Sequence, residues 1–199
     1  MSVVVLISGR GSNLQALIEA GVPVSAVISN VAGADGLAIA ITHGIPTRVV
    51  KHAGFPTREA FDGALASEID RFSPRLVALA GFMRVLTPGF AQRYRDRMLN
   101  IHPSLLPAFP GLNTHERALA EGVKLHGCSV HFVTADLDHG PIVAQAARIV
   151  VPSGTLAARP SMVSATAGGW ARRGRPIGIN VIAWLDMFRL PPRRRASVV

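Results

Sequence analysis

Two polar side chains, Asn100 and His102, stand two residues apart in the segment Asn100-Ile101-His102-Pro103. Side chains two apart on a β-strand point to the same face, so Asn100 and His102 should converge while Ile101 turns to the other face. A carboxamide N–H and an imidazolium N–H placed together can stabilise a negatively charged oxygen. The pattern therefore predicts an oxyanion site. The alternative is a solvated strand end that carries two polar residues.

A carboxylate for this site could come from Asp138, in the loop Thr134-Ala135-Asp136-Leu137-Asp138-His139-Gly140-Pro141. A carboxylate placed against His102 would raise the pKa of the imidazole and fix the orientation of the ring. One alternative is an ordinary Asx turn. Another is a metal site made of His131, Asp136, Asp138 and His139. Three of these four residues share one tight turn and could not easily converge on a single ion, so we predict no metal.

A glycine loop, Gly9-Arg10-Gly11-Ser12-Asn13, lies between an apolar run and a helical pattern. Free backbone N–H groups at a helix N-terminus favour an anion, and phosphate is the guest that we expect. The loop lacks both the Walker sequence and the GxGxxG dinucleotide fingerprint. A tight turn that only requires glycine is the alternative.

A fourth segment, Gly81-Phe82-Met83-Arg84-Val85-Leu86, leaves the end of a buried strand and is mainly apolar with one cation. Such a segment could form the wall of a pocket for a flat aromatic ligand. The alternative is that it belongs to the hydrophobic core.

These segments are separated by strands and helices that alternate along the chain. Aliphatic runs predict strands at residues 3–7, 24–29, 47–50, 76–80 and 98–101, with a late strand pair at 128–134 and 142–151. Helical patterns follow the glycine loop, span residues 36–43, and begin after Thr57, which can cap a helix. The alternation predicts an α/β fold with a doubly wound, mostly parallel open sheet, whose ligands bind beyond the carboxyl ends of the strands.

The composition fits one globular domain with a neutral body and a basic tail. Of the 199 residues, 49% are hydrophobic, and the net charge is +9. Residues 1–152 hold 13 Lys and Arg against 11 Asp and Glu, whereas residues 153–199 hold 8 against 1. The basic charge therefore belongs to the tail, and we expect no nucleic-acid partner for the body.

No apolar run is long enough to span a bilayer and the first residues do not resemble a secretory signal, so we expect no membrane association and a cytoplasmic location. The single cysteine, Cys128, is expected to be a small apolar core residue.

Four motifs in this order resemble the phosphoribosylglycinamide formyltransferase family, which are folate-dependent enzymes of purine synthesis with a Rossmann-like formyltransferase fold. The motifs are Ile7-Ser8-Gly9-Arg10-Gly11-Ser12-Asn13-Leu14-Gln15-Ala16, Leu79-Ala80-Gly81-Phe82-Met83-Arg84, Leu99-Asn100-Ile101-His102-Pro103-Ser104-Leu105-Leu106-Pro107 and Ser129-Val130-His131-Phe132-Val133. The resemblance covers about residues 2–152. It implies formyl transfer from the co-substrate 10-formyltetrahydrofolate to the amine of glycinamide ribonucleotide in de novo purine biosynthesis, by a monomer or homodimer.

The resemblance also implies a role for particular residues. Gly11, Ser12 and Asn13 would hold the phosphate of the ribonucleotide. His102 would be the proton donor, and Asp138 would raise its pKa. The residues expected to contact the folate are Arg58, Met83, Arg84, Val85, Leu86 and Asn100. With this chemistry, Asn100 and protonated His102 would stabilise the oxyanion that forms when the substrate amine attacks the formyl carbon.

The chain departs from the family after residue 151. The family continues into a helix that carries a Gln-x-x-Glu pair, but Ser161 and Ser164 stand at those positions here. Residues 160–179 are rich in Gly, Arg and Ala, whereas the stretch from Ala183 onward again resembles the family's ending. We therefore divide the chain into a catalytic domain, 1–152, and an atypical basic tail, 153–199, that we expect to be poorly ordered. A displaced reading frame in the gene would explain such a tail.

Other activities are less well supported by the sequence. A catalytically weak or silent folate- or nucleotide-binding remnant is the main alternative, because the C-terminal substrate helix is altered. Methionyl-tRNA formyltransferase shares the Asn-x-His-Pro core but needs a folded tRNA-binding domain, which 47 residues without strand pattern do not supply. Formyltetrahydrofolate deformylase usually has an additional N-terminal regulatory domain, which this sequence does not show. An alternative from a different class is a nucleic-acid-associated protein, and it rests on the basic tail alone.

Overall fold

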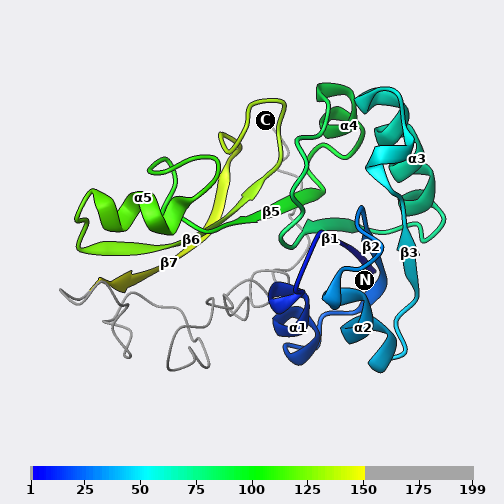
Figure 1. Ribbon diagram of the computed structural model, residues 1–199, viewed down its shortest axis with the longest axis horizontal. Helices are drawn as coiled ribbons and strands as arrows, with labels where there is room; N and C mark the ends of the chain where they lie inside the picture. The colour runs from blue at the N-terminus through cyan, green and yellow to red at the C-terminus, as the bar shows by residue number, and fades with distance from the viewer. Residues whose placement is uncertain (1, 151–199) are drawn as a thin grey trace, which may run out of the picture.

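An uninterrupted run of aliphatic side chains, Val3-Val4-Val5-Leu6-Ile7, forms the central strand of the sheet, β1 (Val3–Ile7), and all five residues are buried. A strand that is apolar at every position needs cover on both faces, which only a sheet between two helical layers provides. The computed structural model describes residues 2–150, and Figure 1 shows this layered arrangement for them.

The elements alternate in the order expected of a doubly wound fold. After β1 they are α1 (Ser12–Glu19), β2 (Val24–Ser29), α2 (Asp35–Thr42), β3 (Thr47–Val49), the short 3₁₀ helix η1 (His52–Gly54), α3 (Arg58–Asp70), β4 (Leu76–Leu79), α4 (Pro88–Arg93), β5 (Met98–His102), α5 (Thr114–Ala120), β6 (Leu125–Phe132) and β7 (Ile142–Ile149).

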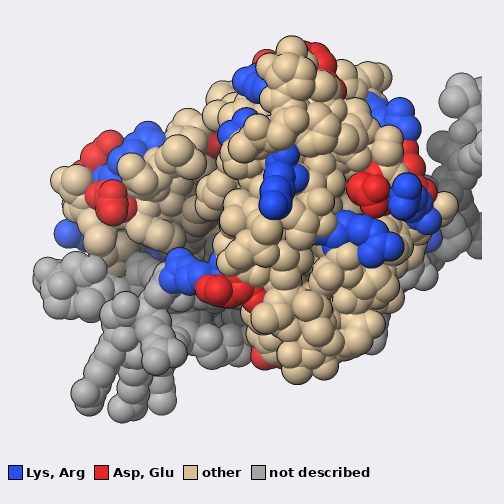
Figure 2. Space-filling model, turned by 45° about the vertical axis from the view of Figure 1, so that its right-hand side comes forward, with Lys and Arg blue, Asp and Glu red and all other residues tan. Residues whose placement is uncertain are grey.

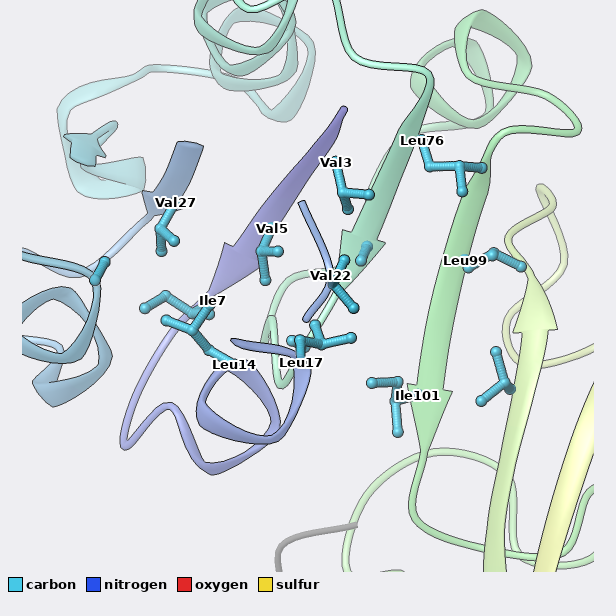
Figure 3. Close-up of a cluster of buried hydrophobic side chains, with 14 of the residues drawn as sticks. Val3, Val5, Ile7, Leu14, Leu17, Val22, Val27, Leu76, Leu99 and Ile101 are labelled. Carbon is cyan, nitrogen blue, oxygen red and sulfur yellow. The ribbon is translucent and has the colours of Figure 1, made fainter. Parts of the chain in front are cut away.

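The two faces of the sheet bury separate hydrophobic clusters. Val3, Val5 and Ile7 of β1 pack against Leu14 and Leu17 of α1, as Figure 3 shows. The alternate residues of the same strand lie in the cluster on the opposite face, with side chains from α3, α4 and the residue after α4 that include Phe61, Leu65, Ile69, Phe90 and Tyr94. The pleat of β1 thus joins both layers.

The strand order is β3-β2-β1-β4-β5-β6-β7. The first five strands pair in parallel, whereas β6 is antiparallel to both of its neighbours. The chain returns from β3 at the edge of the sheet to β4 beside β1, so the strand order reverses between β1 and β4 and the loops after these two strands diverge from one point. In open α/β sheets this is the place where ligands bind.

The predicted strands are confirmed, although their ends differ by up to three residues. The largest difference is β6, which spans Leu125–Phe132 instead of 128–134. Residue 151, the predicted end of the last strand, lies outside the described residues. Thr57 caps α3, because its side chain accepts a hydrogen bond from the backbone N–H of Ala60. Cys128 is 5% exposed and burial raises its thiol pKa to about 11, as expected of a core residue. The helices α4 and α5 were not predicted. The expectation that the tail 153–199 is poorly ordered lies outside the described residues, and the domain boundary at 152 stays a prediction.

Basic and acidic side chains are interspersed on the face seen in Figure 2 and form no continuous basic patch there. None of the helices within residues 2–150 has the length and apolar character that crossing a membrane requires.

Candidate active site

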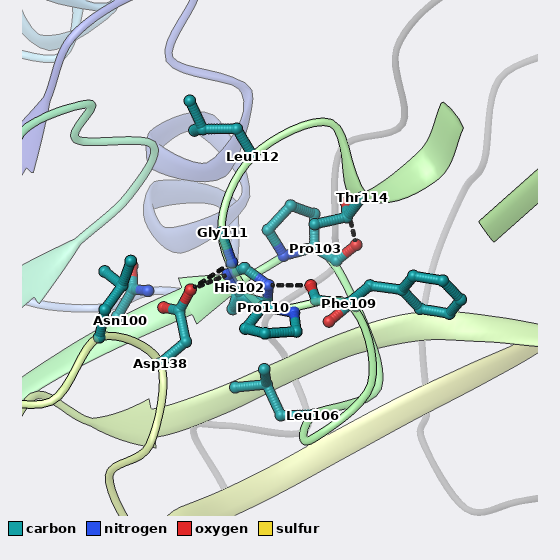
Figure 4. A network of polar contacts seen from close by, with 12 residues as sticks. Asn100, His102, Pro103, Leu106, Phe109, Pro110, Gly111, Leu112, Thr114 and Asp138 are labelled. Carbon is teal, nitrogen blue, oxygen red and sulfur yellow. Dashed lines mark hydrogen bonds and ion pairs between the residues drawn. The ribbon is translucent and has the colours of Figure 1, made fainter. Parts of the chain in front are cut away.

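His102, the last residue of β5, is buried among polar groups, and Figure 4 shows this network of contacts. Its Nε2 is 3.0 Å from the backbone carbonyl oxygen of Phe109, and its Nδ1 is 3.4 Å from Oδ2 of Asp138. The side chains of His102 and Asp138 are each 5% exposed. A carbonyl oxygen can only accept, so Nε2 carries a hydrogen, and protonation of Nδ1 as well would complete an ion pair with Asp138.

Asn100 is half-buried on the same strand and contacts a second histidine, His131. In the sheet it is paired with His131 of β6, and its Nδ2 is 3.2 Å from Nε2 of that ring. The other ring nitrogen, Nδ1, donates to the carbonyl of Phe132 at 3.0 Å. When Nε2 of His131 carries no hydrogen, it accepts from one N–H of Asn100, which leaves the second N–H of the carboxamide for another oxygen.

Asp138 connects these groups. Its Oδ1 is 3.6 Å from Nε2 of His131, and its Oδ2 accepts a hydrogen bond from the backbone N–H of Gly111 at 2.8 Å. Burial raises the pKa of Asp138, but the contact with the His131 side chain, the hydrogen bond from Gly111 and the nearby charge of His102 outweigh this, and the net pKa lies below its usual value. The carboxylate is therefore ionised at neutral pH and provides a negative charge between two imidazole rings.

The structure thus brings together the three residues that the sequence proposed for the reacting centre. The cluster of Asn100, His102, His131 and Asp138 is called the polar cluster below. No other part of the predicted site makes a hydrogen bond or ion pair with it within residues 2–150.

The glycine loop leads from β1 into α1, and Gly11 is the residue that precedes the helix, with φ of 78°. A Cβ added to Gly11 would lie 2.5 Å from Cα of Gly36, so the loop packs against the start of α2 without room for a side chain. The backbone N–H groups at the start of α1 have no side-chain cap. An anion at this helix end would satisfy them and be stabilised by the helix dipole.

The segment 82–86 follows β4 and exposes two apolar side chains, Met83 (67%) and Val85 (54%). Between them, Nε of Arg84 is buried without a hydrogen-bond partner among residues 2–150. Phe82 is buried, so for this one residue the alternative that the segment belongs to the hydrophobic core is correct. Arg58, at the first turn of α3, is exposed. Exposed apolar groups beside an unsatisfied polar atom fit a flat ligand with polar edges, as a pterin has.

Within the described residues, no three His, Cys, Asp or Glu side chains are grouped so as to hold a metal ion. Of the four residues considered for such a site, only His131 and Asp138 contact each other through their side chains, and Nδ1 of His139 instead donates to the carbonyl of Leu137.

The model of one protein family, described as formyl transferase, matches residues 1–163. The chain belongs to the formyl transferase family. Phosphoribosylglycinamide formyltransferase of Escherichia coli (strain K12) is 46% identical over an alignment of 216 positions that covers 99% of each chain. The human trifunctional purine biosynthetic protein adenosine-3 is 49% identical over 161 positions, which cover 78% of this chain and 16% of that much longer protein.

Solved structures of the same family share the fold. The phosphoribosylglycinamide formyltransferase of Coxiella burnetii, solved in complex with CHES, is 52% identical with a TM-score of 0.75, and the match covers 78% of this chain and 75% of that one. The enzyme from Brucella melitensis is 51% identical with a TM-score of 0.71, over 75% of this chain and 80% of that one. The doubly wound, mostly parallel sheet is therefore the formyl transferase fold.

Sequence reasoning missed two contributors to this candidate site. His131 was considered only as a metal ligand, although it contacts both Asn100 and Asp138. Its place on a strand with alternating side chains was a signal that His131 could face a site. The antiparallel register of β6 on β5 was also needed to predict that it lies opposite Asn100. The backbone groups of Phe109 and Gly111 carry no sequence signal, because any residue offers a carbonyl and an N–H.

Proposed function

We propose that this chain is a phosphoribosylglycinamide formyltransferase, which transfers a formyl group from 10-formyltetrahydrofolate to the amine of glycinamide ribonucleotide in de novo purine biosynthesis. The observation that carries the proposal is the 46% identity to the Escherichia coli enzyme over 99% of both chains. The polar cluster supports it, because its donors and its carboxylate suit this transfer.

The folate supplies the formyl carbon and takes up the proton that the attacking amine loses. Negative charge grows on the formyl oxygen during the attack, so a site that places N–H donors at this oxygen lowers the barrier. The second N–H of Asn100 is one such donor. Removal of one preorganised donor typically costs roughly 3 to 4 kcal/mol of barrier, or two to three powers of ten in rate.

His102 is proposed as the second donor and as the group that relays the proton. In the structure its Nε2–H is held by the carbonyl of Phe109. Catalytic hydrogen bonds often form only with substrate bound, so this N–H must exchange the carbonyl for the substrate oxygen. The carbonyl of Phe109 then serves to hold the ring in place until the substrate arrives.

Asp138 is proposed to keep the imidazolium of His102 charged and oriented. Its carboxylate is ionised, buried and fixed by the N–H of Gly111, which supports this role. In this environment a carboxylate stabilises the charged form of a neighbouring imidazole.

The two ligands are proposed to bind at loops that flank the polar cluster. Gly11, Ser12 and Asn13 hold the phosphate with backbone N–H groups at the start of α1. Met83, Arg84, Val85 and Leu86 contact the folate together with Arg58 and Asn100. The exposed apolar side chains of the segment 82–86 and the unsatisfied Nε of Arg84 support the folate assignment.

The test is a transfer assay with the full-length purified protein, in which mass spectrometry detects the formylated ribonucleotide. A glycinamide riboside that lacks the phosphate is the control substrate and should react far more slowly. Binding of both ligands without any product would contradict the proposed activity and support the silent remnant. We further propose a cytoplasmic location and no nucleic-acid or membrane partner. The protein is proposed to be a monomer or a homodimer, and light scattering on the purified protein distinguishes these two states.

A further inference from the structure

Ser8 holds the segment after β4 from two points. It follows the last residue of β1 and directly precedes the glycine loop. Its backbone N–H donates to the carbonyl of Gly81 at 3.1 Å, and its hydroxyl oxygen accepts from the backbone N–H of Met83 at 2.7 Å. The residue that directly precedes the glycine loop therefore also fixes the start of the segment proposed for the folate.

The hydroxyl of Ser8 is oriented by a buried amide. It donates to Oδ1 of Asn30 at 2.6 Å, and Asn30 is 4% exposed. Nδ2 of Asn30 is in turn 3.2 Å from Nδ1 of His52, whose ring packs edge-on against Phe61 of α3. A serine hydroxyl has one hydrogen and two lone pairs. Because the hydrogen is directed to Asn30, a lone pair faces the N–H of Met83.

The contact with Ser8 is the one hydrogen bond that joins residues 82–86 to the rest of the chain within residues 2–150. The next anchor is at Thr87, whose backbone N–H donates to Oδ2 of Asp62 at 2.7 Å. Between these two points the backbone depends on the packing of Phe82 and Leu86. Loss of the Ser8 hydroxyl would leave the N–H of Met83 without its protein partner.

We propose that Ser8 is a positioning residue that couples the two ligand sites: ordering of the glycine loop by the ribonucleotide phosphate fixes Ser8, and Ser8 fixes the segment 82–86 for the folate. The inference rests on the proposed function. Coupling between two sites is reciprocal, so the folate should favour the ribonucleotide by the same factor. The contact is a neutral hydrogen bond, and its loss typically changes an equilibrium by roughly fivefold.

Calorimetry on the full-length protein tests the coupling. The affinity for a non-reactive folate analogue is measured with and without saturating glycinamide ribonucleotide, and the reverse. We expect a ratio of roughly fivefold or more in the wild type and in Ser8→Thr, which keeps the hydroxyl, and a ratio near one in Ser8→Ala. The matched control is Ser25→Ala. The hydroxyl of Ser25 donates to the carbonyl of Val3 at the opposite end of β1, so this variant should keep the wild-type ratio.

An unchanged ratio in Ser8→Ala would overturn the coupling while the proposed function stands, whereas a wild type that binds neither ligand would overturn both. A second measurement needs no variant. Amide hydrogen exchange in the wild type should show slow exchange at Met83 that becomes slower when the ribonucleotide alone is added. Fast exchange at Met83, or exchange that the ribonucleotide does not change, would also overturn the coupling.

Discussion

The paired histidines His115 and His126 make the stability of the fold sensitive to mild acid. Nδ1 of His115 and Nε2 of His126 are 2.8 Å apart, so one must donate and the other accept, and both rings cannot be fully protonated. Burial, together with the nearby His115 and His102, lowers the pKa of His126 to about 4 from its ordinary 6.5. Burial also lowers the pKa of His115.

The sign of the pH effect follows from these shifts. Between about pH 6.5 and pH 4, the unfolded chain binds a proton at His126 and the folded chain does not. The contribution of His126 to the free energy of unfolding must therefore fall as the pH is lowered through this window, and this contribution is nearly constant above it. A difference of about 2.5 pKa units corresponds to on the order of 3 kcal/mol, and His115 adds to it in the same direction. This is a large part of the 5 to 15 kcal/mol typical of a domain.

Urea unfolding at several pH values between 7.5 and 4.5 measures this effect. The variant His126→Gln has no ionisable group at this position and should lose less stability on acidification than the wild type, even if it is less stable at pH 7.5. His43→Gln is the matched control, because His43 is exposed at the end of α2. If the pH dependence of His126→Gln equals that of the wild type, the buried pair is not the source and the reasoning is refuted.

Three further outcomes are expected. His102→Ala or Asn100→Ala should lower kcat by about two orders of magnitude or more, and near-normal turnover in either variant would exclude a role as donor. Asp138→Asn removes the charge beside His102, so the loss of activity at alkaline pH should move to more acidic pH; a pH profile identical to that of the wild type would contradict the pairing. Gly11→Ala, at φ of 78° and with no room for a Cβ, should lower the free energy of unfolding by about 2 to 4 kcal/mol. Gly9→Ala has open space and should change it little, and equal stabilities in denaturant would count against steric exclusion.

The sequence predicted the parallel half of the sheet well because its strands are apolar throughout, as Val3–Ile7 is, and that pattern has few other solutions. The helix α5 was missed because Thr114–Ala120 buries only Thr114 and Ala118, which leaves no apolar stripe to detect. Asn100 and His102 were found from the alternation of a single strand. His131 joins them only through the pairing of β5 with β6, which is a property of the tertiary structure and leaves no local pattern.

The close approach of Gly11 and Gly36 also limits how this chain can vary. A Cβ on Gly11 would meet the backbone of Gly36, and a Cβ on Gly36 would lie 2.6 Å from Cδ1 of Ile7 and 2.9 Å from Cα of Gly11. A change at one position cannot be compensated by a smaller residue at the other, since neither has a side chain to lose. Neither Gly11 nor Gly36 can therefore be replaced by a larger residue, alone or together, without a shift of the backbone. At Gly9 and Gly33 an added Cβ would meet open space, so larger residues fit there.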